Sequence, residues 1–164
     1  INTDWPSLAG QNQKYLYDQL VYFVNGEREN ALMTAVIPYL KTLSSDELLD
    51  VAAYYSESSA SVGQADSDVD LLALGESLYR AGDLNRGIPA CTACHSLYGE
   101  GNIQAGFPKI SGQQKGYLIS TLKEYRSQSR NAGNYALVMQ AASANLKDDD
   151  IEALANYMHG LYRK

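Results

Sequence analysis

The stretch "IPACTACHSLYGEG", from Ile88 to Gly101, contains both cysteines of this 164-residue chain and one of its two histidines. Cys91 and Cys94 stand three positions apart and His95 follows directly, which gives the pattern C-x-x-C-H. This pattern is typical of covalent c-type haem attachment. At this spacing each thiol can form a thioether with one vinyl group of a haem, and the imidazole is held beneath the iron as its proximal ligand. The motif therefore predicts one covalently bound haem c.

Three other uses of the cysteine pair fit the sequence less well than haem attachment does. A dithiol redox centre usually begins a helix that follows a strand, whereas "GDLNRGIPA", residues 82–90, is polar and turn-forming. A zinc site needs four ligands, and only His159 remains as a further cysteine or histidine. A disulfide across two residues would be strained and would close almost no loop. Haem attachment is the interpretation that the histidine supports.

The composition is that of a globular protein, with 45% apolar and 20% charged residues. No stretch approaches the run of ~20 apolar residues that a membrane-spanning helix needs. No signal peptide is visible at Ile1, so we expect a mature form from which a leader was removed. With 19 acidic against 13 basic residues, the charge disfavours nucleic acid and an anionic membrane surface as partners.

The chain contains an internal repeat. "WPSLAGQNQKYLYDQL" at residues 5–20 aligns with "FPKISGQQKGYLISTL" at 107–122, and "LSSDELLDVAAYY" at 43–55 aligns with "LKDDDIEALANYM" at 146–158. A polar, Ser-rich segment without periodicity separates the halves and is predicted to be a linker. These patterns predict three parts: a first domain at residues 1–58, a linker at 59–70 and a second domain at 71–164.

The first domain is predicted to be incomplete. The first pair of aligned blocks is offset by 102 positions, so the counterpart of Cys91 would stand before Ile1. The first half contains no cysteine and no histidine. Within this sequence it can therefore neither attach a haem covalently nor ligate one through histidine, and we expect it to pack on the second half or on a partner.

The expected fold class is all-α. Leu16 and Phe23 fall on one face at helical spacing, and Ser44 with Glu47 forms a capping-box pattern. The acidic residues 148–150 suit the start of a last helix, because a helix N-terminus favours negative charge. No segment of useful length alternates as a strand would. The sequence predicts two tandem helical domains with long loops.

Met139 is the candidate sixth iron ligand. It lies downstream of the motif in "NAGNYALVMQAASANL", predicted to be irregular, from which a thioether could reach the open haem face. Met158 belongs to the apolar stripe of the last helix and Met33 to the first half, so both are interpreted as packing residues. A His/Met pair favours an electron carrier over an enzyme or gas binder, since only His159 remains as a further histidine and it ends a helix.

The second half, from about Leu71, resembles class I cytochromes c, and the two halves together resemble the dihaem cytochromes c4. The resemblance rests on "ACTACH", "GFPKISGQQKGYL", "ALVMQAASANL" and "DDDIEALANYMHGL". It implies a periplasmic carrier of single electrons, with respiratory partners such as a quinol-linked donor and a terminal oxidase. It also implies thioethers at Cys91 and Cys94, iron ligands His95 and Met139, and a Pro108 carbonyl that accepts the second imidazole N–H.

The chain departs from that family in lacking the first haem motif. Native loss, cleavage and supply of the missing part by another polypeptide all remain open. A further hypothesis is therefore an assembly role, in which the first half binds another cytochrome subunit or self-associates. The 13 tyrosines and Trp5 are compatible with such an interface, since aromatic residues are enriched there.

Overall fold

The computed structural model describes residues 2–163 and is helical in both halves. Within these residues no strand forms, and the only extended pairings are the isolated bridges Asp83–Ile88 and Asn102–Phe107. The all-α prediction is confirmed. The helices are α1 (Gln13–Asn25), α2 (Ile37–Leu40), α3 (Ser45–Glu57), α4 (Val69–Ala81), the 3-10 turn η1 (Leu84–Arg86), α5 (Thr92–His95), α6 (Lys115–Arg126), α7 (Ala136–Ser143) and α8 (Asp148–Gly160).

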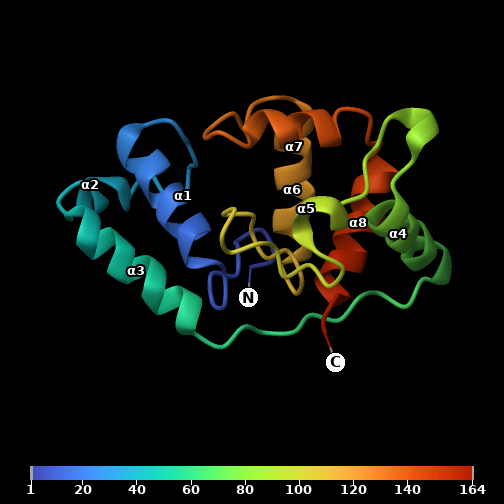
Figure 1. Cartoon of the computed structure of the whole chain (residues 1–164), viewed down its shortest axis with the longest axis horizontal. Coiled ribbons are helices and arrows are strands. Elements are labelled where there is room, and N and C mark those ends of the chain that lie inside the picture. The colour runs from blue at the N-terminus through green and yellow to red at the C-terminus, as the bar shows by residue number, and fades with distance from the viewer. Residues whose placement is uncertain (1, 164) are drawn as a thin grey trace.

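The two halves lie side by side (Figure 1). Helices α1 to α3 form one end of the molecule and α4 to α8 the other, and an extended segment after α3 runs along the lower edge to join them. Helix α4 begins at Val69, where the Asp68 side chain accepts hydrogen bonds from the N–H groups of Asp70 and Leu71. The last two residues of the predicted linker are therefore helical.

Local sequence signals place the helix ends. The capping box at Ser44 is present, because its hydroxyl accepts from the Glu47 N–H while the Glu47 carboxylate accepts from the Ser44 N–H. Helix α8 starts at Asp148 with three acidic residues in its first turn, as the sequence predicts. At the repeated turns before α1 and α6, Gly10 and Gly112 have the same left-handed φ of 69°, which disfavours any residue with a side chain.

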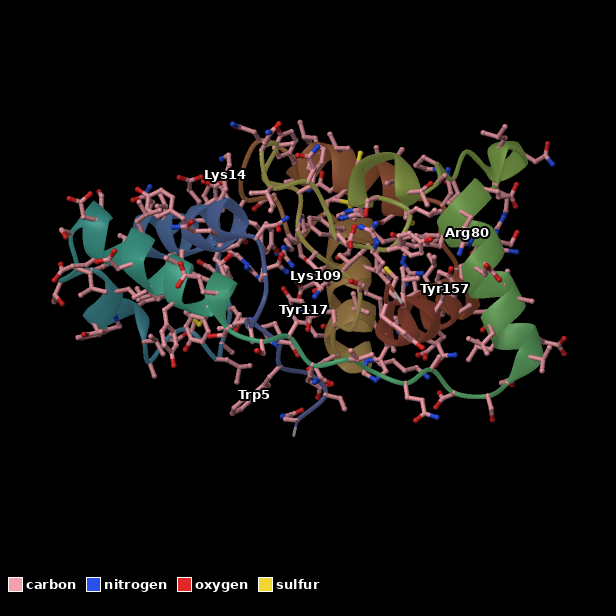
Figure 2. The ribbon with its side chains drawn as sticks, turned by 60° about the horizontal axis from the view of Figure 1, so that its bottom comes forward. Trp5, Lys14, Arg80, Lys109, Tyr117 and Tyr157 are labelled. Atoms are coloured by element: carbon pink, nitrogen blue, oxygen red, sulfur yellow. The ribbon has the colours of Figure 1, made fainter. Side chains whose placement is uncertain are left out.

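The core of the second half forms where α4 crosses α8. Gly75 makes this crossing possible, because a Cβ atom there would lie 2.2 Å from the Ala153 carbonyl oxygen. The ring of Tyr79, which is fully buried, lies 5.4 Å from that of Tyr157. Figure 2 shows Tyr157 beside Arg80 at this crossing. Buried side chains of both helices complete the core, among them Leu78, Ile151, Leu154 and Met158.

The first half has a smaller core and one open face. Helix α3, the repeat counterpart of α8, packs against α1 through Leu48 and Ala52. No helix of the described chain covers α3 as α4 covers α8. Tyr54, the counterpart of Tyr157, is consequently 69% exposed. Within the described residues, α3 therefore has one exposed face at the position where α8 has a helix partner.

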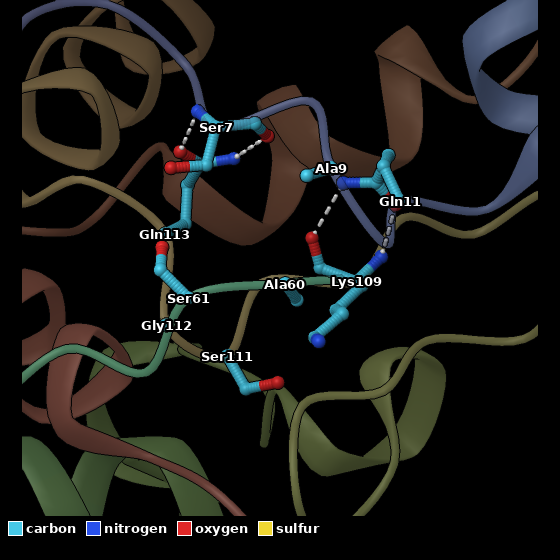
Figure 3. Close-up of a pocket in the computed structure, with 9 residues that line it drawn as sticks. All are labelled: Ser7, Ala9, Gln11, Ala60, Ser61, Lys109, Ser111, Gly112 and Gln113. Atoms are coloured by element: carbon cyan, nitrogen blue, oxygen red, sulfur yellow. Dashed lines mark hydrogen bonds between the residues drawn. The ribbon is translucent and has the colours of Figure 1, made fainter. Parts of the chain in front are cut away.

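The halves meet in a seam held by two reciprocal glutamines. Gln11 of the first half accepts from the Lys109 N–H (2.7 Å) and donates to the Lys109 carbonyl (2.8 Å). Gln113 of the second half accepts from the Ser7 N–H (2.7 Å) and donates to the Ser7 carbonyl (3.0 Å). Both pairs surround a small hollow (Figure 3). Because each glutamine and each partner are repeat counterparts, the seam is close to two-fold symmetric, and the expected packing of the first half on the second is confirmed.

Candidate haem site

A single helical turn presents the motif residues. Helix α5 covers Thr92–His95, Cys91 precedes it, and the His95 N–H donates to the Cys91 carbonyl at 3.0 Å. Ser96 then adopts a left-handed φ of 67°, which turns the chain sharply away. Cys91 and Cys94 are half-buried free thiols, so they are not joined to each other. The turn therefore brings two thiols and an imidazole to one place.

His95 is held in the form that binds a metal. Its ring is 7% exposed, and Nδ1 lies 3.0 Å from the carbonyl oxygen of Pro108. A carbonyl only accepts, so Nδ1 carries the proton and Nε2 keeps its lone pair. Burial lowers the pKa of His95, although the Pro108 carbonyl acts in the opposite direction. A neutral imidazole with a free Nε2 is the form that ligates iron.

The loop after the motif places the Pro108 carbonyl beside Nδ1 of His95. Gly101 allows the close approach, because a Cβ atom there would lie 2.5 Å from the Pro108 oxygen. The ring centre of Phe107 lies 6.5 Å from that of His95 and 4.8 Å from that of Tyr135. The loop is thus fixed by both its backbone and its aromatic packing.

Met139 lies on α7, and the expectation of an irregular segment there is wrong. The octapeptide "ALVMQAAS" consists mostly of good helix formers. It is too short to show a clear helical periodicity, and the preceding "NAGNY" is typical of a loop. Met139 is half-buried and packs against the second-half core, and the next residue, Gln140, donates to the Arg130 carbonyl at 3.0 Å. Met158 is 3% exposed in the core, as the sequence predicts, and Met33 is half-buried in the first half.

The cysteine environment does not favour dithiol exchange. Burial raises the pKa of the Cys91 thiol to about 11, so the thiolate that attacks a disulfide is scarce at neutral pH. The structure does not support zinc binding either. Residues 2–163 contain no group of three or more cysteine, histidine or acidic side chains that could hold a metal ion. His159 lies apart from the motif, with Nδ1 2.8 Å from the Gln113 carbonyl oxygen.

The donor set fits a covalently bound haem. Two unpaired thiols and a neutral imidazole come from one turn, and a thioether comes from a separate helix. Three apolar side chains on α7 and on the loop after the motif are exposed, namely Leu137, Val138 and Ile103. A large ring could cover them. Sequence reasoning missed Gln11 and Asn12, which bind this loop from the first half. The recurrence of Gly-Gln at 10–11 and 112–113 was the available signal.

The family model for cytochrome c matches residues 72–161. The chain is 39% identical to cytochrome c4 of Pseudomonas aeruginosa, over 97% of this chain and 77% of that protein. The chain belongs to the cytochrome c4 family. The crystal structure of reduced recombinant cytochrome c4 from Pseudomonas stutzeri superposes with a TM-score of 0.89 at 40% identity, covering 98% of this chain and 86% of that one.

A second likeness is to an enzyme complex. The thiosulfate dehydrogenase TsdBA from Marichromatium purpuratum matches with a TM-score of 0.81 and 34% identity, over 96% of this chain and 33% of that one. As a cytochrome c4, the chain is an electron carrier, and it binds haem c through the motif at Cys91, Cys94 and His95. None of the helices in residues 2–163 has the length and apolar character needed to cross a bilayer.

Proposed function

We propose that this chain moves single electrons in the periplasm through one haem c, between respiratory partners such as a quinol-linked donor and a terminal oxidase. Cys91 and Cys94 form the thioethers, and His95 and Met139 are the iron ligands. The carrying observation is the buried His95 ring, whose Nδ1 is committed to the Pro108 carbonyl while Nε2 stays free. The proposed parts are a haem-free domain at 1–58, a linker at 59–70 and the haem domain at 71–164.

The residues of the chain set the conditions for electron transfer. When bound, the haem supplies a one-electron Fe(III)/Fe(II) couple. A thioether ligand such as Met139 raises the potential of that couple. The hydrogen bond from His95 to Pro108 fixes the ring in one orientation, so ligand geometry changes little between redox states. His95 needs to take up no proton, because burial keeps it neutral.

A second candidate is an electron-accepting subunit of a larger multi-cytochrome assembly. The likeness to thiosulfate dehydrogenase TsdBA over nearly the whole chain supports it, as does a curated relative from Thiomonas intermedia that is named a thiosulfate dehydrogenase electron acceptor and is 34% identical. The first half would then bind another cytochrome subunit or self-associate, and the exposed rings of Tyr39 and Tyr54 offer contact area.

The intact mass of the denatured protein tests the haem count. A mass equal to residues 1–164 plus one haem supports the proposal, whereas the bare chain mass refutes covalent attachment. Light scattering on the native protein separates the two candidates, since a lone carrier is monomeric and an assembly subunit self-associates or binds an added cytochrome.

Substitution of each methionine tests the sixth ligand. Met139→Ala should abolish the weak absorption band at the red edge that reports a sulfur–iron bond. Met33→Leu and Met158→Leu are the matched controls and should leave the band in place, because neither side chain is proposed to reach the iron. Retention of the band in Met139→Ala would exclude Met139 as a ligand.

A further inference from the structure

We propose that Gln11, in the first half, tunes the iron ligand His95 of the second half through a hydrogen-bond chain that crosses the Pro108–Lys109 peptide group. This inference rests on the proposed ligation of the haem by His95. It gives the first half a direct part in setting the redox potential, beyond any role as scaffold or docking surface.

One peptide group joins the two residues. Its carbonyl, from Pro108, accepts the Nδ1–H of His95 at 3.0 Å. Its N–H, from Lys109, donates to Oε1 of Gln11 at 2.7 Å. The chain of hydrogen bonds therefore runs from His95 through a single amide to the Gln11 side chain. Figure 3 shows Gln11 and Lys109 joined in this way across the seam.

Further contacts hold Gln11 in this orientation. Its Nε2 donates to the Lys109 carbonyl at 2.8 Å, and its Oε1 also accepts from the Asn12 N–H at 2.8 Å. Asn12 in turn donates through Nδ2 to the Phe107 carbonyl, on the other side of Pro108. Gln11 and Asn12 are each 6% exposed, so water does not compete for these bonds. The first half thus forms hydrogen bonds with the loop on both sides of Pro108.

The electronic consequence has a definite sign. Hydrogen bonds in a chain polarise one another, so an amide that donates through its N–H has a more negative carbonyl oxygen. A stronger acceptor at Pro108 draws the Nδ1 proton of His95 and makes the imidazole a more basic ligand. A more basic ligand favours ferric over ferrous iron, because it donates more electron density. Gln11 therefore lowers the midpoint potential.

The repeat supplies a matched control inside the same molecule. Gln113 makes the same pair of bonds to Ser7, and its Oε1 likewise accepts from the next residue, Gln114, at 2.9 Å. The peptide group that it polarises contains the carbonyl of Pro6, and residues 1–58 include no histidine that could bind that carbonyl. Removing either glutamine side chain thus removes the same hydrogen bonds from the seam, but within residues 1–164 only Gln11 is connected to a proposed iron ligand.

The deciding experiment is a redox titration of the haem-loaded variants Gln11→Met and Gln113→Met. Gln11→Met should raise the midpoint potential, equivalent to about a two- to fivefold change in the oxidised-to-reduced ratio at fixed solution potential. Gln113→Met should leave it unchanged. NMR of the reduced protein should show faster exchange of the His95 Nδ1 proton in Gln11→Met alone. Equal shifts in both variants, or none in either, would overturn the proposal.

A second pair of variants tests the proposal if the methionine variants fail to fold. Gln11→Glu keeps an oxygen acceptor for the Lys109 N–H and strengthens it with charge, so it should lower the potential. Gln113→Glu places the same charge at the repeat position and should lower it less. Equal midpoint potentials for these two variants would refute the proposed chain of hydrogen bonds. Absence of a covalent haem spectrum from the unmodified protein would instead refute the haem attachment on which this inference rests, so the two failures are distinguishable.

Discussion

Arg130, which follows α6 in the second half, donates a hydrogen bond of 2.9 Å to the hydroxyl of Tyr15 on α1 of the first half. Arg130 is 6% exposed, and in the described chain it forms no ion pair with a carboxylate. Its guanidinium instead lies 4.9 Å from the ring centre of Tyr125 and 3.4 Å from the hydroxyl of Tyr117. Arg28, the repeat counterpart of Arg130, also faces Tyr117. Phenols therefore surround a buried positive charge at the seam.

The first prediction is that Tyr117 ionises far below the ordinary range of a phenol. Burial alone would raise the pKa of Tyr117, but Arg130 and Arg28 outweigh it and lower the pKa to about 7. Between pH 7 and 10 the unfolded chain keeps the phenolic proton while the folded chain has lost it, so stability should rise with pH and be lost as pH falls through about 7. Tyrosinate absorbance in the near ultraviolet should grow over the neutral range.

Tyr117→Phe is the control for this titration. It should remove the low-pH step of the absorbance change and flatten the dependence of stability on pH. Tyr15→Phe should leave that step in place, because burial raises the pKa of Tyr15 to about 12. A first tyrosine titration near pH 10 in the unmodified protein would contradict the assignment.

The second prediction concerns the crossing of α4 and α8. Gly75→Ala should destabilise the fold by about 2 kcal/mol, because the added methyl group would overlap the Ala153 carbonyl. The sign is diagnostic, since replacing a glycine by alanine inside an ordinary helix stabilises it by about 0.5–1 kcal/mol. Ser77→Ala, at an exposed position of the same helix, is the control and should change stability by less than about 0.5 kcal/mol. Denaturant unfolding measures both.

The third prediction concerns the anchor of α8. Asp150 is 4% exposed and accepts from Arg86 at 2.7 and 3.2 Å and from the Lys147 N–H at 2.8 Å. Asp150→Asn should lower the free energy of unfolding by about 1–3 kcal/mol. This lies toward the lower end of the range for breaking a buried ion pair, because Arg86 is partly exposed. Asp149→Asn removes an exposed charge from the same turn and should cost less than about 1 kcal/mol.

The same carboxylate should make the second half acid-sensitive. Burial acts to raise the pKa of Asp150, but the hydrogen bonds from Arg86 and Lys147 outweigh it and hold the pKa below its usual 3.8. The stabilisation is therefore fully present above pH 3.8 and is lost as pH falls through the lower folded value. Acid unfolding followed by circular dichroism should be shifted to higher pH in Asp150→Asn. An unchanged acid midpoint would exclude this ion pair as its cause.

The amino-acid sequence by itself determined the features that depend on neighbours along the chain. The spacing of Cys91, Cys94 and His95 indicates the cofactor, because thioether and iron chemistry requires that spacing. Helical periodicity predicts the all-α class, and the Ser44 capping box marks the start of α3. The repeat predicts two related halves. Each of these signals spans a few residues or compares one segment with another.

Only the tertiary structure decided which groups meet across the seam. Gln11 and Lys109 are 98 positions apart, and Arg130 and Tyr15 are 115 apart, so no local pattern reports either contact. An amide side chain also leaves no periodic signature, because its contribution depends on the backbone groups that folding brings within reach. The chain specifies the haem attachment motif locally, but the surroundings of His95 are completed by side chains of the other half of the molecule, Gln11 and Asn12.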